Sequence, residues 1–132
     1  MFLLDTNICI YAVKGTYHSI ADKLLQLHPD KIKISAVTIM ELEYGITKSK
    51  WGDKNRMAMQ TFLASFDTIP FTEEDALLCG KLRAELAASG APIGAYDIMI
   101  AAQALVRGLT VVTHNTREFQ RIPNLRLADW AE

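Results

Sequence analysis

The sequence contains only two cysteines, Cys9 and Cys79, and neither belongs to a Cys-x-x-Cys pair or to another metal-ligand spacing. This pattern offers no thiolate metal site. Both cysteines are therefore interpreted as reduced thiols in a hydrophobic core, which fits a cytoplasmic protein.

The sequence also has no excess of positive charge. Its 14 Lys and Arg residues are balanced by 15 Asp and Glu residues, for a formal net charge of -1 and a pI near 6.3. The overall basic character that usually marks a nucleic-acid-binding protein is missing. A polyanionic substrate would have to be held by a local positive patch or through bound cations.

Membrane-spanning runs and common cofactor motifs are missing as well. No apolar run approaches membrane-spanning length, and the first residues lack the basic segment of a signal peptide, so we expect a soluble cytoplasmic protein without a membrane partner. There is no glycine-rich phosphate loop, no Gly-x-Ser-x-Gly elbow and no Asp-x-Asp motif after the first apolar run. His18, His28 and His114 match no zinc spacing.

Half of the 132 residues are hydrophobic, which is enough for one buried core. No linker, repeat or low-complexity segment divides the chain, so we expect a single domain over residues 1–132. Short apolar runs bounded by turn residues predict strands at 2–4, 31–35, 67–71 and 109–113, with 125–130 as an edge strand. The alternating lysines of 31–35 indicate a half-exposed strand near an edge.

Helical spacing and capping residues predict the remaining elements. Helices are expected from Asp5 to before Gly15, over 19–27, from a Thr38/Glu41 capping box, and over 57–66, 72–90 and 95–107. The segment 48–56 is expected to be a polar loop or helix junction, and 116–120 a short turn or helix. Strands that alternate with helices indicate a parallel sheet covered on both faces. The C-terminal ends of all its strands would then share one end of the sheet.

Acidic residues are expected at this shared end: Asp5, Glu41, Asp97 and Glu118. Asp5 follows the first strand, Glu41 falls in the first turn of a helix, Asp97 begins a helix, and Glu118 follows the strand at 109–113. Each taken singly is explained as a helix cap, the acid of a capping box or a surface charge.

Four carboxylates in one place would repel one another unless a cation neutralised them. Oxygen ligands without supporting histidine or thiolate favour Mg²⁺ or Mn²⁺ over zinc. A Mg²⁺ ion held by a few carboxylates commonly completes its shell with water and phosphate oxygens. The pattern therefore indicates phosphodiester or phosphoryl chemistry.

Four segments resemble, in order and spacing, the motifs of the PIN-domain ribonucleases. They are Leu4-Asp5-Thr-Asn-Ile, Ser35-x-Val-Thr-x-x-Glu41, Pro92-x-Gly-x-x-Asp97-x-x-Ile-Ala and Val112-Thr-x-Asn115-Thr-Arg-Glu-Phe119. Within that family the chain is most similar to the VapC toxins of bacterial toxin-antitoxin pairs, over essentially its whole length.

This resemblance implies a PIN-like three-layer α/β/α sandwich on a short, mostly parallel sheet, and Mg²⁺-dependent endoribonuclease activity with Mn²⁺ as a substitute ion. Asp5 and Asp97 match the family's principal metal-binding acids, and Glu41 matches the acid between them. Many relatives carry Asp where Asn115 stands, whereas in this chain the nearby acid is Glu118. Because an amide binds a divalent cation more weakly than a carboxylate, the number of metal ions, one or two, stays open.

The resemblance adds roles for polar residues and a reaction. Thr6, Thr113 and Asn115 are interpreted as support for water or phosphate, with ordinary turn hydrogen bonds as the alternative. Metal-activated water would attack the RNA phosphodiester and leave 5′-phosphate and 3′-hydroxyl ends. Residues that could form a local positive patch are Arg83, Arg107, Arg117, Arg121 and the segment 48–56, although most such charges cover solvated helix faces.

The same resemblance implies a target and partners. The branch with the Asp-Thr-Asn-Ile-Cys-Ile start implies cleavage of the anticodon loop of initiator tRNA, a homodimer, and inhibition by a small antitoxin that crosses the acidic site. Tyr44, Trp51, Met57 and Met59 are candidates for the antitoxin groove, with core packing favoured for the two Met residues. A housekeeping RNA-processing PIN nuclease and a non-catalytic PIN scaffold are the alternatives.

Overall fold

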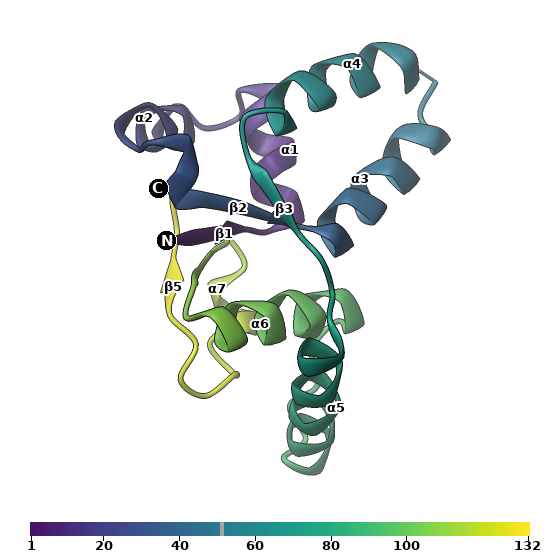
Figure 1. Ribbon diagram of the computed structural model, residues 1–132, viewed down its shortest axis with the longest axis vertical. Helices are drawn as coiled ribbons and strands as arrows, with labels where there is room; N and C mark the ends of the chain where they lie inside the picture. The colour runs from purple at the N-terminus through teal and green to yellow at the C-terminus, as the bar shows by residue number, and fades with distance from the viewer. Residues whose placement is uncertain (51) are drawn as a thin grey trace.

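In residues 1–50 and 52–132, the part of the chain that this computed structural model describes, five parallel strands form one sheet (Figure 1). The strand order is β3-β2-β1-β4-β5, and every strand pairing is parallel. The bounds are β1 Phe2–Leu4, β2 Ile32–Ser35, β3 Asp67–Ile69, β4 Thr110–Val112 and β5 Leu127–Ala128. The expected α/β sandwich on a short parallel sheet is confirmed.

The position of β2 differs from the expectation. β2 pairs with β1 on one side and with β3 on the other, so it is an interior strand. The lysines mislead because Lys31 precedes the strand in a 3-10 turn, while the Nζ of Lys33 reaches 3.0 Å to the carboxylate of Asp67 on the edge strand β3. The expectation of an edge strand near the C-terminus is correct, since β5 is outermost.

Helices cover both faces of the sheet (Figure 1). On one side lie α1 Thr6–Lys14, α2 His18–Gln26, α3 Ala36–Lys48 and α4 Gly52–Leu63, and on the other lie α5 Glu73–Ala88, α6 Ala95–Arg107 and the short α7 Thr116–Phe119. None of the helices in the described residues is long and apolar enough to cross a bilayer.

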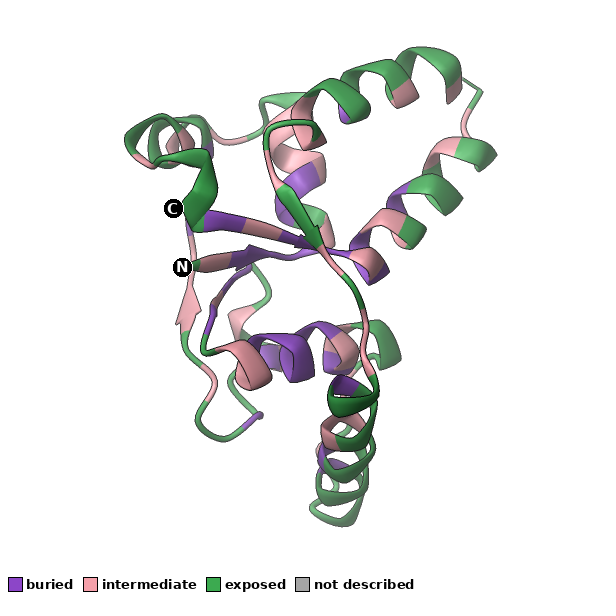
Figure 2. Ribbon diagram, viewed as in Figure 1, coloured by how far each residue is buried: buried purple, intermediate pink, exposed green. Residues whose placement is uncertain are grey.

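Alternation along β1 divides the core into two halves, because successive strand side chains point to opposite faces. Leu3 packs with the apolar faces of α5 and α6, including Leu82 and Ile100, whereas Leu4 packs with Ile8 and Ile20 from α1 and α2. Figure 2 shows the buried residues concentrated along the sheet and α6. Cys9 and Cys79 are free thiols, as expected, and Cys9 is fully buried.

The start of α3 corrects the expected capping box. Ser35 is the N-cap, and its Oγ accepts a hydrogen bond of 2.9 Å from the backbone N of Val37. Thr38 is therefore inside the first turn and fully buried, and Glu41 lies in the second turn. The Thr-x-x-Glu spacing is misleading here because Ser35, at the end of β2, is itself a good N-cap.

The other capping signals are mostly confirmed. Thr72 and Asp75 form a capping box at the start of α5, and Gly90 follows that helix with a positive φ of 72°. The polar segment 48–56 is less loop-like than expected, because α3 extends to Lys48 and α4 already begins at Gly52. Charged residues favour neither state by themselves, so packing decides.

A buried ion pair joins α5 to α6. Asp75 is fully buried, and its carboxylate receives hydrogen bonds of 2.7 and 3.0 Å from the guanidinium of Arg107. Burial alone would raise the pKa of Asp75, but the hydrogen bonds from Arg107 and Thr72 hold it below its usual value. Arg107 also donates to the carbonyl oxygens of Gln103 and Pro70.

We predict that Arg107→Ala lowers the free energy of unfolding by about 3 kcal/mol, because it leaves the Asp75 carboxylate buried without its partner. Urea unfolding followed by circular dichroism measures this change. Arg56→Ala, which removes a pair with the exposed Glu43, is the matched control and should cost no more than about 1 kcal/mol. Equal losses in the two variants would contradict the role assigned to the buried pair.

Candidate active site

The strand register lines up polar residues at the C-terminal end of the sheet. Leu4 lies opposite Val112, and Val112 lies opposite Ala128, so the next residues, Asp5, Thr113 and Asp129, stand side by side. The backbone N of Asp5 donates to the carbonyl of Val112, and that of Thr113 donates to the carbonyl of Ala128, each at 3.0 Å. Neighbouring strands are about 4.8 Å apart, so these side chains are close enough to interact.

Asp5 both caps a helix and presents a carboxylate at this end. Its Oδ1 accepts a hydrogen bond of 2.9 Å from the backbone N of Ile8, so the capping role expected for it is confirmed. Burial raises the pKa of Asp5 to about 6, against the lowering effect of hydrogen bonds from Thr113 and Ile8, and the charges of Glu41 and Asp129 add to the rise. Asp5 is only 5% exposed.

Glu41 is oriented by a hydroxyl from another helix. The Oγ1 of Thr6 donates to Oε1 of Glu41 at 2.7 Å and lies 3.1 Å from the Oγ1 of Thr38. Thr6 is the first residue of α1, so the helix that Asp5 caps also positions Glu41. This places Glu41 beside Asp5 although it lies one turn deeper in α3 than the sequence suggested.

Asp97 and Glu118 form a coupled pair of carboxyl groups. Burial raises the pKa of Asp97 to about 7, and the charges of Glu118, Asp5 and Glu41 raise it further. The pKa of Glu118 is lowered, chiefly by the hydrogen bond of 2.6 Å from the backbone N of Gly94 and also by one of 2.7 Å from the amide of Asn115. The pKa values of the two carboxyl groups are thus shifted in opposite directions.

These contacts place the expected polar residues. Thr6 supports Glu41, Thr113 supports Asp5, and Asn115 supports Glu118, so all three hold a carboxylate in position. The Oγ1 of Thr113 also accepts a hydrogen bond of 2.9 Å from the backbone N of Asn115, which is ordinary turn bonding.

The donor set is chemically suited to a hard divalent cation. Four carboxyl groups, one directly before α1 and the others on α3, α6 and α7, interact electrostatically. Burial is the largest cause of the raised pKa of Asp97, and the charges of the other three groups add to it. Within residues 1–50 and 52–132, no three acidic, histidine or cysteine side chains are gathered tightly enough to form a preformed metal cluster. A cation would offset this repulsion, and the carboxylate oxygens present fit a hard divalent ion.

Sequence reasoning missed one acid of this end of the sheet. Asp129 follows β5 as Asp5 follows β1, and its carboxylate lies 2.9 Å from Nδ1 of His114. The sequence signal is the acid directly after Leu127 and Ala128. A strand predicted over the whole of 125–130 hides this signal, because the acid then falls inside the strand and does not mark its end.

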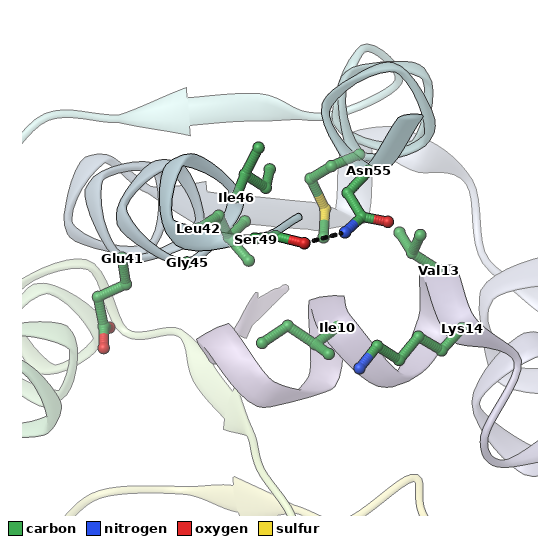
Figure 3. A pocket seen from close by; sticks show the side chains of 10 residues that line it. Ile10, Val13, Lys14, Glu41, Leu42, Gly45, Ile46, Ser49 and Asn55 are labelled. Carbon is green, nitrogen blue, oxygen red and sulfur yellow. Dashed lines mark hydrogen bonds between the residues drawn. The ribbon is translucent and has the colours of Figure 1, made fainter. Parts of the chain in front are cut away.

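A groove runs away from Glu41 between α1 and the pair of helices α3 and α4 (Figure 3). Its volume is about 300 Å³, and Figure 3 shows Glu41 at one end and Lys14 at the other. The lining is mainly apolar: Ile10, Val13, Leu42, Gly45, Ile46 and Met59, with Lys14, Glu41, Ser49 and Asn55.

The candidates for an antitoxin groove fall in different places. Met59 lines the groove and is buried, as core packing predicts. Core packing is wrong for Met57, which is 71% exposed in the middle of α4. Tyr44 is 63% exposed and contacts Lys48. Trp51 lies outside the described residues.

Two of the basic candidates for an RNA patch already have partners. Arg107 pairs with the buried Asp75, and Arg56 pairs with Glu43. Arg121 lies near the site, since it donates to the carbonyl of Pro92 at 2.9 Å and its charge lowers the pKa of Glu118.

Comparison with known proteins matches the PIN domain model to residues 2–125. A protein named tRNA(fMet)-specific endonuclease VapC, from Shigella flexneri, is 43% identical over 130 residues, which is 98% of each chain. VapBC2 from Rickettsia felis, solved with a DNA fragment from its promoter, has a TM-score of 0.92 at 38% identity, covering 98% of each chain.

Two further solved structures have a fold similar to that of this chain. DNA-bound VapBC from Salmonella typhimurium has a TM-score of 0.91 at 42% identity, covering 98% of this chain and 97% of that one. A toxin-antitoxin complex from Klebsiella pneumoniae has a TM-score of 0.74 at 28% identity, over the whole of this chain and 99% of that one. The motifs, the fold and these similarities agree, and the chain belongs to the PIN-domain family, within its VapC group.

Proposed function

We propose that this chain is a metal-dependent endoribonuclease toxin that hydrolyses RNA phosphodiester bonds. The observation that carries the proposal is the set of four coupled carboxyl groups at the C-terminal end of the sheet, with the pKa of Asp97 raised to about 7. Open α/β sheets place their chemistry at this end. The names of the similar VapC proteins, endonuclease and ribonuclease, support the same activity.

Asp5, Asp97 and Glu41 are the residues that would hold Mg²⁺ or Mn²⁺, and Glu118 would complete the catalytic set. When bound, a divalent cation supplies a water of lowered pKa and stabilises the charge that develops on the phosphate. The chain itself orients the ligands. Thr113 and the backbone N of Ile8 hold Asp5, whereas Thr6 holds Glu41.

Glu118 has a separate task in this scheme. The backbone N of Gly94 and the amide of Asn115 fix its carboxylate as an anion next to Asp97. A Cβ built on Gly94 would lie 3.4 Å from the Asp97 carboxylate and 3.6 Å from that of Glu118, so Gly94 adjoins both acids. An anion held there would orient the attacking water or a bound cation.

The proposed substrate is the anticodon loop of initiator tRNA, cut in the cytoplasm by a single domain over residues 1–132, with loss of translation as the result. The similar tRNA(fMet)-specific proteins support this substrate. A housekeeping RNA-processing PIN nuclease remains the alternative, and a non-catalytic scaffold is disfavoured because Asp5, Glu41 and Asp97 are all present.

The proposed regulation is binding of a cognate antitoxin to a homodimer of this chain, within a larger assembly. We place a segment of the antitoxin in the groove between α1 and α3/α4, because the groove is apolar and opens at Glu41. A bound segment would then end at the carboxylates and obstruct them. Solved VapBC complexes of similar fold support an antitoxin partner.

We expect Asp97→Asn to lower RNA cleavage about 100-fold or more while the fold is retained. The variant should also be more stable than the wild type in EDTA. A carboxyl group whose pKa is raised by folding does not lower the free energy of unfolding at a pH below its unfolded pKa, near 3.9. The group lowers that free energy increasingly as the pH rises toward the folded pKa of about 7. Urea unfolding at pH 4 and pH 8 should show the gain only at pH 8.

Asp22→Asn, on the exposed face of α2, is the control and should change neither cleavage nor stability. Collapse of the Asp97→Asn fold would show that Asp97 is a structural cap. Full activity would remove Asp97 from the catalytic set.

We predict that induction of the chain in cells cuts initiator tRNA in the anticodon loop and stops growth, and that Asp5→Ala abolishes both effects. Sequencing of RNA ends should find 5′-phosphate and 3′-hydroxyl products. Cleavage in vitro should stop in EDTA and return with Mg²⁺ or Mn²⁺. Cyclic phosphate ends, or activity that persists in EDTA, would rule out the mechanism, whereas intact tRNA with normal growth would count against a toxin.

We predict that Gly45→Phe lowers the affinity for the cognate antitoxin at least about tenfold without loss of nuclease activity. Gly45 lines the groove, and a Cβ built there meets nothing within 4 Å, so the new ring would enter the groove without straining the fold. Calorimetric titration measures the affinity. Gly80→Phe, at an equally open position on α5, is the control, and an equal loss there would move the antitoxin elsewhere.

A further inference from the structure

Three aromatic rings lie together beside the carboxylates: Tyr11 of α1, Tyr17 between α1 and α2, and His114 after β4. The rings of Tyr11 and Tyr17 meet edge to face with centroids 5.1 Å apart, and the ring of His114 lies 5.5 Å from Tyr17 and 6.5 Å from Tyr11. The two tyrosines are partly exposed, and the side chain of His114 is 44% exposed. We call these three residues the aromatic shelf.

The ring of His114 is held in a fixed orientation. Its Nδ1 lies 2.9 Å from Oδ2 of Asp129, whose side chain is only 12% exposed. Asp129 is anchored in turn, because its Oδ1 accepts a hydrogen bond of 2.8 Å from the backbone N of Ala131. A ring that is already ordered loses little conformational entropy when a ligand packs on it.

The shelf begins next to the proposed catalytic residues. His114 directly follows Thr113, whose side chain hydrogen-bonds to Asp5. Asp129 stands in the same row as Asp5 and Thr113 at the C-terminal end of the sheet, and its charge reaches Asp5. Whatever lies on the shelf is therefore a neighbour of the carboxylates.

We propose that an unpaired RNA base stacks on the aromatic shelf, next to the phosphodiester that the carboxylates cut. This inference rests on the proposed nuclease function. The net charge of -1 and the acids of the site give RNA little overall attraction, so a contact that does not depend on charge is needed. Stacking on aromatic side chains provides one, and bases in single-stranded loops are free to use it.

A binding experiment tests the shelf directly. The full chain, in the Asp97→Asn background that blocks cleavage, is titrated in Mg²⁺ into the anticodon stem-loop of initiator tRNA carrying 2-aminopurine at one loop position at a time. At one position the 2-aminopurine fluorescence should be quenched by stacking. His114→Ala should remove this quenching and raise the dissociation constant about tenfold, whereas His114→Phe, which keeps a ring, should restore both.

Steady-state cleavage in the otherwise wild-type chain supplies a second readout. His114→Ala should raise KM about tenfold and leave kcat nearly unchanged, because the stacked base lies outside the reacting group. The matched control is His28→Ala. His28 also contacts an acid, Asp30, at 3.3 Å, but it precedes β2 and so lies at the opposite end of the sheet.

Several outcomes would overturn the inference. Unchanged quenching in His114→Ala would contradict it. An equal loss of quenching and affinity in His114→Phe would assign the effect to the contact with Asp129. The same loss in His28→Ala would show that the effect is not specific to the shelf. Weaker antitoxin binding with normal RNA binding would reassign the shelf to the protein partner. If the wild type shows quenching but no cleavage, base stacking on the shelf is supported and the nuclease function is rejected. If it shows cleavage but no quenching, the nuclease function is supported and stacking on the shelf is rejected.

Discussion

Burial of several carboxyl groups close together at the C-terminal end of the sheet is the constraint on which the rest of the structure depends. Asp5 stands directly after β1, whereas Glu41, Asp97 and Glu118 come from α3, α6 and α7. Burial is the main cause of the raised pKa values of Asp5 and Asp97, and repulsion between neighbouring carboxylates adds to this cost. Such a cost persists only where the surrounding fold fixes the groups in place. A divalent cation turns the same repulsion into a binding site.

The fold meets this cost with specific polar support and with a core on both faces of the sheet. Asp5, Glu41 and Glu118 each receive a hydroxyl, amide or backbone N–H donor. In the described residues no buried side-chain polar atom lacks a hydrogen-bond partner. Behind the site, Gln103 of α6 hydrogen-bonds to Ser35 and to the carbonyl of Pro70, which ties α6 to β2 and to the end of β3. The helix that carries Asp97 is thereby fixed against the sheet.

The same end of the sheet offers surfaces of different character around one centre. The apolar groove reaches the carboxylates at Glu41, whereas the aromatic shelf reaches them through Thr113 and Asp129. A protein segment suits the first surface, and a flat base suits the second. In the proposed scheme, substrate and inhibitor would approach the acids from different sides, and an inhibitor that covered Glu41 and its neighbours would prevent cleavage.

The sequence by itself determined the local elements and most of the chemistry. The strand at 2–4, the capping box at Thr72, the helix over 95–107 and the buried strand before His114 follow from nearby residues, because periodicity and caps act within a few positions. The four acids were visible for the same reason. Only the tertiary structure placed β2 inside the sheet, moved Glu41 to a second turn oriented by Thr6, and brought Asp129 and His114 beside Asp5. Those outcomes depend on strand pairing and on contacts between distant segments, which local patterns do not encode.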